Sequence, residues 1–574
     1  MLDFKKEFKR WTENENLEAD LKKDLDSIAS NESEIEDRFY QDLSFGTAGL
    51  RGKLGAGTNR MNIYTVARAT RGFAKVIEKH GQDAKEMGVV IAHDCRIKSD
   101  EFARISAEIL ATYGIKVYIF DSLRPTPELS FAVRHLGCIA GINITASHNP
   151  KEYNGYKAYW KEGSQIKDDI ANKILEEIEK TDIFTNEAVM PFEEGIEKGY
   201  INIVGKEVDE AYYEKVLSVS LTDDVNKDIK IVYTPLNGAG NIAVRTILER
   251  KGYKNVFVVK EQEQPDGTFP TIDYPNPEDQ RAFEYAKKLG IEKDADILIA
   301  TDPDSDRLAV QVRDGDTFVG FNGNQIGVIL INYILECMKK TGKLPANGAI
   351  IKSIVTGDMG AKIASEYGVK TYNVLTGFKN IAELQNKWDA SGVHTFVFGY
   401  EESIGYNAGN FVRDKDAVSS ALLLAEAAAY YSKQGKTLKD VLDELFDKYG
   451  YYAEDTVSIV LEGIEGQEKI KRIMTEIRSC FPKRLGDTSA VTTRDYVTLI
   501  ETDIATNTTK SIEMEKTNAF ECRYEDGSWF TLRPSGTEPK IKMYIYTNSD
   551  SLEKSKSKVN EIVTEVKKAI DNVK

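Results

Sequence analysis

The strongest constraint on the fold of this chain is a recurring order of strands and helices in which a buried strand ends in a polar loop. In the first round, apolar runs at 88–94 and 137–144 alternate with helical patterns at 99–114 and 126–137. Such alternation predicts a sheet of parallel strands joined by crossover helices. The last run continues into TASHNP at 145–150, at the carboxyl end of a strand, where such sheets bind ligands.

The same order returns twice. In the second round, the strand at 295–301 runs into DPDSDR (302–307). In the third round, the strand at 394–399 runs into YEES (400–403). We therefore expect three similar mixed α/β domains whose loops face one shared cleft. From about residue 450 strands and helices end in a long C-terminal helix, which predicts a fourth, α+β domain with its own polar loop, RPSGTEPK.

The length of the chain agrees with several domains, because 574 residues are too many for one hydrophobic core. The first forty or so residues have the charged, amphipathic pattern of a helical extension. We predict a first domain with this extension and TASHNP, followed by domains that carry DPDSDR, YEES and RPSGTEPK. The predicted boundaries are 1–205, 206–322, 323–449 and 450–574.

The composition bounds the partners and the compartment. A net charge of −16 repels nucleic acid and anionic membranes, so we expect neither as a partner. No apolar run approaches the ~20 residues that span a bilayer, and the charged N-terminus, MLDFKKEFKRW, is not a signal peptide. The 5 cysteines are scattered without a CxxC pair, which favours free thiols in a reducing compartment. We expect a cytoplasmic protein.

DPDSDR is a candidate metal site. Asp302, Asp304 and Asp306 alternate, so an extended loop would present their carboxylates on one side. Hard cations such as Mg²⁺ prefer oxygen ligands, and close carboxylates repel one another without a cation. An EF-hand is excluded, because Arg307 and Arg313 stand where its glycine and glutamate are required. The alternative is a solvated acidic turn.

Other loops suit phosphate and sugar. RPSGTEPK offers Arg533, hydroxyls and a glycine that lets backbone N–H groups approach an anion, although a plain hairpin turn has the same composition. GTAGLRG (46–52) offers Arg51, but glycine-rich loops are common. The two glutamates of YEES have the chemistry to accept hydrogen bonds from sugar hydroxyls, unless they are merely solvated. Lys415 lies between acids, where a surface ion pair is the alternative.

Ser147 of TASHNP is the candidate nucleophile. Adjacent side chains of an extended segment point to opposite sides, so we do not expect Ser147 and His148 to form a dyad. No G-x-S-x-G elbow is present, and the GKT of QGKT (434–437) lacks the first glycine of a P-loop because Tyr430 stands there. A serine beside a cation and phosphate-binding loops is best interpreted as a phosphoryl carrier.

TASHNP, DPDSDR, GYEES and RPSGTEPK, in this order and at these spacings, resemble the loops of the α-D-phosphohexomutases. GTAGLRG and RDKDA (413–417) fit as well, the resemblance covers essentially the whole chain, and the longer bacterial phosphoglucomutases are most similar. It implies a heart-shaped, four-domain isomerase that interconverts glucose 1-phosphate and glucose 6-phosphate. It also implies a phosphoserine, a glucose 1,6-bisphosphate intermediate that serves as activator, and one Mg²⁺ per chain.

The resemblance further implies roles for individual residues. Ser147 would carry the phosphoryl group and add a ligand to the metal site of Asp302, Asp304 and Asp306. The basic residues near the reaction centre, none singled out as acid or base, would be Arg51, His148, Lys157 and Lys415. The substrate-binding positions would be Thr47, Arg307, Thr376, Glu401, Ser403, Arg533, Ser535, Gly536 and Thr537.

Two other functions stay open. A phosphopentomutase or phosphomannomutase would use the same chemistry, and Tyr400, where shorter family members often have glycine, leaves the sugar preference undecided. A non-catalytic sugar-phosphate-binding protein would keep RPSGTEPK and YEES but would not need the serine and all three aspartates. The expected partners are hexose phosphates, and the expected state is a monomer or dimer.

Overall fold

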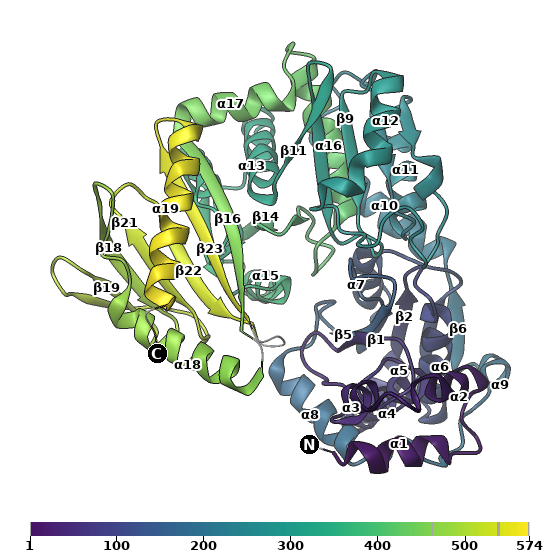
Figure 1. Ribbon diagram of the computed structural model, residues 1–574. Helices are drawn as coiled ribbons and strands as arrows, with labels where there is room; N and C mark the ends of the chain where they lie inside the picture. The colour runs from purple at the N-terminus through teal and green to yellow at the C-terminus, as the bar shows by residue number, and fades with distance from the viewer. Residues whose placement is uncertain (1, 462, 536–539, 572, 574) are drawn as a thin grey trace. The chain divides into compact units, whose positions relative to one another are not determined.

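The computed structural model describes residues 2–461, 463–535, 540–571 and 573 (Figure 1). The chain divides into two compact units. Unit 1 comprises Met1–Ala349 and Phe378–Leu438, and unit 2 comprises Ile350–Gly377 and Lys439–Lys574. No helix in the described part of the chain is both long enough and apolar enough to cross a membrane.

Unit 1 begins with the predicted helical extension, which consists of α1 (Phe4–Thr12), α2 (Ala19–Ile28) and α3 (Glu32–Phe39). Asp3 and Asn31 cap α1 and α3 by accepting hydrogen bonds from backbone N–H groups of the first turn. The apolar faces of the three helices meet around Trp11 and Phe39, both fully buried, in a cluster that also includes Ala56 and Ile183.

The first sheet of unit 1 has the strand order β1-β5-β4-β2-β3-β6. Its strands are β1 (Leu50–Lys53), β2 (Val89–His93), β3 (Val117–Phe120), β4 (Ala140–Ile144), β5 (Tyr153–Trp160) and β6 (Ile201–Val204). Its helices are α4 (Ile63–Lys79), α5 (Gln82–Met87), α6 (Ser99–Thr112), α7 (Thr126–His135), α8 (Asp168–Glu179), α9 (Phe192–Glu197) and α10 (Lys206–Leu217). The predicted parallel centre is confirmed, because β4, β2, β3 and β6 pair in parallel.

The second sheet has the order β11-β10-β9-β7-β8. Its strands are β7 (Ile231–Thr234), β8 (Val256–Val258), β9 (Ile297–Thr301), β10 (Leu308–Asp314) and β11 (Thr317–Phe321). The accompanying helices are α11 (Gly240–Arg250), η1 (Lys260–Gln262), η2 (Gln280–Phe283), α12 (Glu284–Lys293) and α13 (Gly323–Lys340). The 3₁₀ turn η2 is followed directly by α12.

The third round is shared between the units. Unit 1 contains α15 (Phe378–Ser391), β14 (Thr395–Glu401), β15 (Gly405–Asn407) and α16 (Ala417–Ser432). Unit 2 contains α14 (Met359–Glu366) and β13 (Lys370–Val374), and the boundaries fall within β12 (Gly348–Ser353) and α17 (Leu438–Tyr449).

One local arrangement recurs in all three rounds of unit 1. TASHNP joins β4 to the antiparallel β5, DPDSDR joins β9 to the antiparallel β10, and the YEES loop joins β14 to the antiparallel β15. In each loop one non-glycine residue adopts the left-handed backbone conformation, with φ of 53° at Ser147, Ser305 and Ile404. The polar loops are therefore tight turns that reverse the chain, and they do not lead into crossover helices.

Most of unit 2 is an antiparallel sheet with the order β16-β23-β22-β21-β18-β19-β20, and β17 pairs with β18. Its strands are β16 (Tyr451–Val460), β17 (Arg484–Leu485), β18 (Thr488–Asp495), β19 (Ile500–Asp503), β20 (Thr509–Ser511), β21 (Phe520–Tyr524), β22 (Trp529–Pro534) and β23 (Lys540–Ser549). Helices α18 (Gly463–Cys480) and α19 (Leu552–Asp571) bury apolar side chains in the core of this sheet. Figure 1 shows α19 lying along the sheet.

The predicted fold class, mixed α/β domains followed by an α+β domain, is confirmed. In the last domain, the segment 484–528 contains the strands β17 to β21, which the sequence did not reveal. These strands are short and polar on one face, so they lack the apolar runs by which the other strands were found.

Candidate active site

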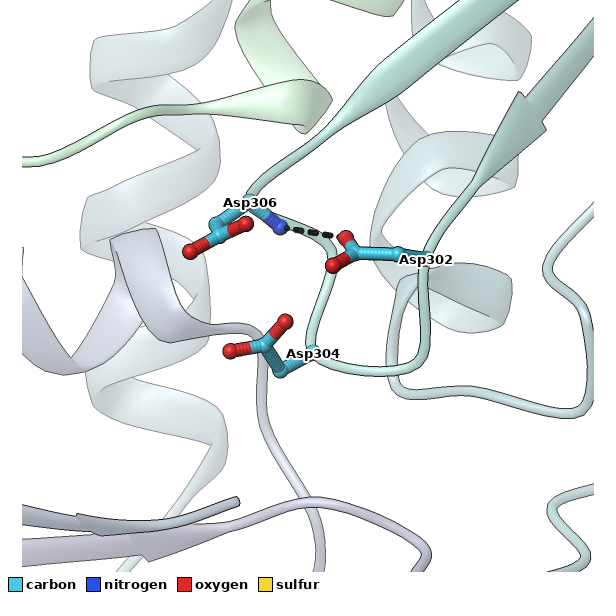
Figure 2. Close-up of side chains that lie close together, drawn as sticks. All are labelled: Asp302, Asp304 and Asp306. Atoms are coloured by element: carbon cyan, nitrogen blue, oxygen red, sulfur yellow. Dashed lines mark hydrogen bonds between the residues drawn. The ribbon is translucent and has the colours of Figure 1, made fainter. Parts of the chain in front are cut away.

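The carboxylates of Asp302, Asp304 and Asp306 converge at the end of β9, as Figure 2 shows. One ligand atom from each lies within 4.8 Å of the others, and all three residues are buried. Asp302 Oδ1 accepts hydrogen bonds from the backbone N–H groups of Asp306 (3.1 Å) and Arg307 (2.9 Å). The carboxylates gather as predicted, but a turn at Ser305 brings them together rather than an extended loop.

Two lysines offset the negative charge of this cluster. Lys157 Nζ lies 2.6 Å from Asp304 Oδ2 and 3.2 Å from Asp306 Oδ2, and Lys415 Nζ lies 3.0 Å from Asp306 Oδ2. Burial acts to raise the pKa of Asp306, but the two lysines outweigh it and hold that pKa far below its usual range. Burial and the neighbouring aspartates instead raise the pKa of Asp302. The solvated-turn alternative is therefore excluded for DPDSDR.

The cluster fits a divalent metal ion. Asp304 Oδ1 and Asp306 Oδ1 are buried and have no hydrogen-bond partner among the described residues. A buried carboxylate oxygen without a partner is costly, and a cation relieves that cost. The three oxygen ligands are of the kind that Mg²⁺ prefers, and they leave coordination positions for a substrate or a second protein group.

Ser147 lies at the end of β4, buried and adjacent to this cluster. Its Oγ is 2.9 Å from Asp302 Oδ2 and 3.0 Å from His148 Nδ1. The expectation that Ser147 and His148 cannot meet is wrong, because Ser147 has a left-handed backbone and the segment is not extended. Burial, together with Arg307 and Arg51, lowers the pKa of His148 well below its ordinary value. The lowered pKa favours the neutral form of the imidazole.

Hydrogen bonds from backbone and side-chain donors join the metal loop to its neighbours within unit 1. Leu308 N donates to Ile404 O at 3.1 Å, and Arg307 Nη1 donates to Ser403 O at 2.9 Å. From the first domain, Thr126 N donates to Asp304 O at 2.8 Å, and its hydroxyl donates to Asp304 Oδ2 at 2.6 Å. The loops that the sequence placed at three separate strand ends thus form one connected centre.

The remaining candidates of unit 1 are Arg51, Glu401 and Thr47. Arg51, in β1, donates from Nη1 to Asn149 Oδ1 of the serine loop at 3.2 Å. Glu401 ends β14 and is buried. Thr47 Oγ1 accepts a hydrogen bond from Lys379 Nζ at 2.8 Å. Lys379 was missed in the sequence, and its only signal is its position at a helix start just after a glycine.

Three candidates lie in described parts of unit 2. Thr376 follows β13, and Arg533 lies in β22, in register with Lys542 of β23. Ser535 N donates to Lys540 O at 2.8 Å, next to the antiparallel pairing of β22 with β23. Gly536 and Thr537 lie outside the described residues.

Comparisons with known proteins cover nearly all of the chain. Phosphoglucomutase/phosphomannomutase alpha/beta/alpha domains I, II and III match residues 42–183, 210–315 and 322–449, and the C-terminal domain of that family matches 497–566. The predicted domain boundaries remain predictions.

Curated relatives and solved structures agree with this match. A phosphoglucomutase of Staphylococcus epidermidis is 38% identical over 551 residues, which cover 95% of this chain and 98% of the relative. One of Staphylococcus aureus strain MRSA252 is 36% identical over 95% of this chain and 97% of its own length. The open form of the Paramecium phosphoglucomutase parafusin has the same fold, with a TM-score of 0.66 at 18% identity over 93% of this chain and 95% of its own.

Proposed function

The chain belongs to the phosphoglucomutase/phosphomannomutase family, and we propose that it interconverts α-D-glucose 1-phosphate and glucose 6-phosphate by passing a phosphoryl group through Ser147. It is an isomerase. The observation that carries the proposal is the buried Ser147 hydroxyl, 2.9 Å from a carboxylate of the aspartate cluster and 3.0 Å from His148. Relatives with the same activity in their names extend over nearly the full length of the chain.

In the first half of the reaction, phosphorylated Ser147 gives its phosphoryl group to the C6 hydroxyl of glucose 1-phosphate. The O6–P bond forms as the Oγ–P bond breaks, and the hydroxyl proton ends on Ser147 Oγ. The resulting glucose 1,6-bisphosphate turns over. In the second half, Oγ attacks the phosphorus at C1, the O1–P bond breaks, and the proton returns to O1, which leaves glucose 6-phosphate and phosphorylated Ser147.

The groups around Ser147 Oγ have two tasks, which are to move the hydroxyl proton and to balance the negative charge of the phosphoryl group. The 3.0 Å separation between Ser147 Oγ and His148 Nδ1 supports a role of His148 in taking the Oγ proton and returning it. Lys157 and Lys415 are held cationic by the aspartates, which raise the pKa of both against the effect of burial. Their charge, with that of Arg51 and Arg307, suits the negative charge of a phosphoryl group in transfer.

We assign one Mg²⁺ per chain to Asp302, Asp304 and Asp306, with an oxygen on Ser147 as a further ligand. When bound there, the ion would neutralise charge on the phosphoryl group. Glucose 1,6-bisphosphate acts as activator because it restores the phosphoryl group to an enzyme that has lost it. Lys157 and Lys415 lower the pKa of Asp306 and so favour the ionised carboxylate that a metal ligand requires.

The remaining candidates would bind the substrate. We assign the phosphate that does not react to Arg533, Ser535, Gly536 and Thr537. We assign the sugar hydroxyls to Thr376, Glu401 and Ser403, with Thr47 and Arg307 near the transferring group. The protein would be cytoplasmic, since all 5 cysteines are free thiols. Its state as a monomer or dimer remains a prediction.

Turnover of glucose, mannose and ribose 1-phosphates, each with its bisphosphate activator, tests the proposed substrate. We expect the highest kcat/KM for glucose 1-phosphate and complete dependence on a divalent cation. A higher value for ribose 1-phosphate would make the protein a phosphopentomutase, and one for mannose 1-phosphate would make it a phosphomannomutase. Binding of all three without turnover would leave only the non-catalytic alternative.

A further inference from the structure

Arg96 is a buried residue that the proposed reaction does not use, yet it contacts the serine loop at four points. It follows β2, and its side chain is 0% exposed. Its Nη2 donates to Ser147 O (2.6 Å) and Asn149 O (2.5 Å), and its Nη1 donates to Pro150 O (2.9 Å) and Tyr153 O (3.0 Å). One guanidinium therefore binds four backbone carbonyls of a single seven-residue turn.

Asp94 connects the same guanidinium to the front of the turn. Its Oδ2 lies 3.2 Å from Arg96 Nε and accepts a hydrogen bond from Thr145 Oγ1 at 2.6 Å. Thr145 Oγ1 in turn accepts one from the backbone N–H of Ser147 at 2.9 Å. Ser147 is thus held from its carbonyl by Arg96 and from its N–H by the pair of Asp94 and Thr145.

The backbone of Ser147 needs such support. Its φ of 53° lies in the left-handed region, which is unfavourable for a residue with a Cβ. Residues of this kind persist only where the surroundings over-determine them. The left-handed turn is also what brings Oγ within hydrogen-bond distance of both Asp302 and His148. The conformation that costs free energy is therefore the one that aims the nucleophile.

We propose that Arg96 is the positioning residue of the phosphoryl carrier: its guanidinium fork, braced by Asp94, holds Ser147 in the left-handed conformation that aims Oγ at Asp302. The planar fork matters, because two terminal nitrogens in fixed geometry serve four carbonyls, and a single ammonium cannot replace them. The ring of Phe269, from the loop before η2, lies 5.1 Å from the guanidinium carbon and covers it. The effect on turnover rests on the proposed function, but the effect on the loop does not.

The test compares Arg96→Lys with Arg38→Lys in the full-length protein. Arg38 is a matched control, since it is also a mostly buried arginine of the first domain and pairs with Asp24 and Glu34, away from the serine loop. Hydrogen exchange of the segment 145–153 is measured by mass spectrometry in both variants and the wild type. We expect at least about tenfold faster exchange of this segment in Arg96→Lys only, with β2 and β4 unchanged.

Kinetics give the second readout. Misplacing a reacting group by about 1 Å costs on the order of 10²-fold in rate, so we expect kcat of Arg96→Lys to fall by that order while KM for glucose 1-phosphate stays within about threefold. Arg38→Lys should keep the wild-type values. Asp94→Asn should cause a smaller loss of kcat, since it removes the charge that pairs with Arg96 and leaves the guanidinium bound to the loop carbonyls.

Unchanged exchange of 145–153 in a folded Arg96→Lys protein would overturn the proposal, and so would a normal kcat. If Arg96→Lys exchanged faster throughout unit 1, the residue would be merely structural, and Asp94→Asn would then have to show the local effect for the proposal to stand. If the wild type did not convert glucose phosphates at all, the proposed function would fail. The exchange measurement would still test whether Arg96 holds the serine loop in place.

Discussion

The serine loop at 145–150 and the metal loop at 302–307 have the same backbone design and opposite chemistry. Each follows a buried parallel strand, turns into an antiparallel one, and has a serine with φ of 53° at its bend. Ser147 Oγ contacts His148 and Asp302, whereas Ser305 Oγ is buried and has no hydrogen-bond partner among the described residues. The turn alone therefore does not make a serine reactive.

The surroundings separate the two loops. Arginines contact the serine loop, with Arg96 on its carbonyls and Arg51 on Asn149. The metal loop carries the three carboxylates and is met by Lys157 and Lys415. One loop is thus prepared to receive the negative phosphoryl group and the other to hold a cation beside it. A shared backbone turn thus sets the shape of both loops, and the charged side chains around each loop decide its chemical role.

The largest expected effect breaks the likeness between the two serines. Ser147→Ala should lose at least about 10³-fold in kcat, because the variant has no oxygen to carry the phosphoryl group. Ser305→Ala, which removes a hydroxyl from the same backbone conformation, should keep most of its turnover. Initial rates with glucose 1-phosphate test both. A large, equal loss in the two variants would mean that the turn matters more than the nucleophile.

The next effect concerns the charge of the metal loop. Asp304→Asn should weaken Mg²⁺ binding and reduce kcat by about 10²-fold, since one anionic ligand is lost and Lys157 keeps only Asp306 as a partner charge. Calorimetric titration with Mg²⁺ measures the affinity. The exposed Asp316, in the turn between β10 and β11, supplies the control Asp316→Asn, which should bind the ion as the wild type does. Equal affinities in all three proteins would return DPDSDR to a structural role.

The third effect concerns Arg533, which we assign to the phosphate that does not react. Arg533→Ala should raise KM by about 10- to 100-fold for glucose 1-phosphate and glucose 6-phosphate alike. The reason is that the variant loses a charge-assisted contact with the phosphate, which contributes about 1.5–3 kcal/mol to binding. Ser147 should still accept a phosphoryl group in this variant. Arg484→Ala, at an exposed arginine of β17, is the control. If only one of the two substrates were affected, a single phosphate-binding role shared by both would be ruled out.

The smallest effect concerns α7, whose Thr126 donates a hydrogen bond to Asp304 of the metal loop. Glu128 of this helix is fully buried, and burial, followed by Asp209, raises its pKa well above the ordinary value. A raised folded-state pKa gives stability that is complete below the unfolded pKa, about 4.3, and is lost as pH rises towards the folded pKa. Glu128→Gln lacks this loss, so its stability advantage over the wild type should grow from pH 5 to pH 8.

Chemical denaturation at the two pH values measures this difference, with turnover at pH 7 as a check that the loops are intact. An advantage that stays constant from pH 5 to pH 8 would show that Glu128 is ionised in the folded protein over that range. In that case α7 would carry a second buried negative charge behind the aspartates.

The sequence predicted the loops well because parallel strands buried on both faces are continuous apolar runs, and each such run ends at a loop. It did not predict β5 or β10, the strands after the loops, because Asn154, Gly155 and Lys157 interrupt one apolar run and Gln311 interrupts the other. The contact of Ser147 with His148 was missed for a different reason. A left-handed backbone is not visible in a sequence unless glycine or asparagine marks it.

Long-range contacts were the least predictable part. Arg96 lies about fifty residues before the loop that it binds, and Lys379 lies more than three hundred residues after Thr47. Neither residue belongs to a polar strand-end motif like those that revealed the other candidates. Only the folded arrangement of strands brings such pairs together, and a single sequence carries no signal for it.

The central claim is that Ser147 passes its phosphoryl group directly to the sugar. The most direct test is to phosphorylate the enzyme with labelled glucose 1,6-bisphosphate, remove free ligand, and mix it rapidly with unlabelled glucose 1-phosphate. The account predicts that the label leaves Ser147 at least as fast as kcat and appears in glucose 1,6-bisphosphate and glucose 6-phosphate. Label that stays on Ser147 during turnover, or that leaves only as inorganic phosphate, would contradict it.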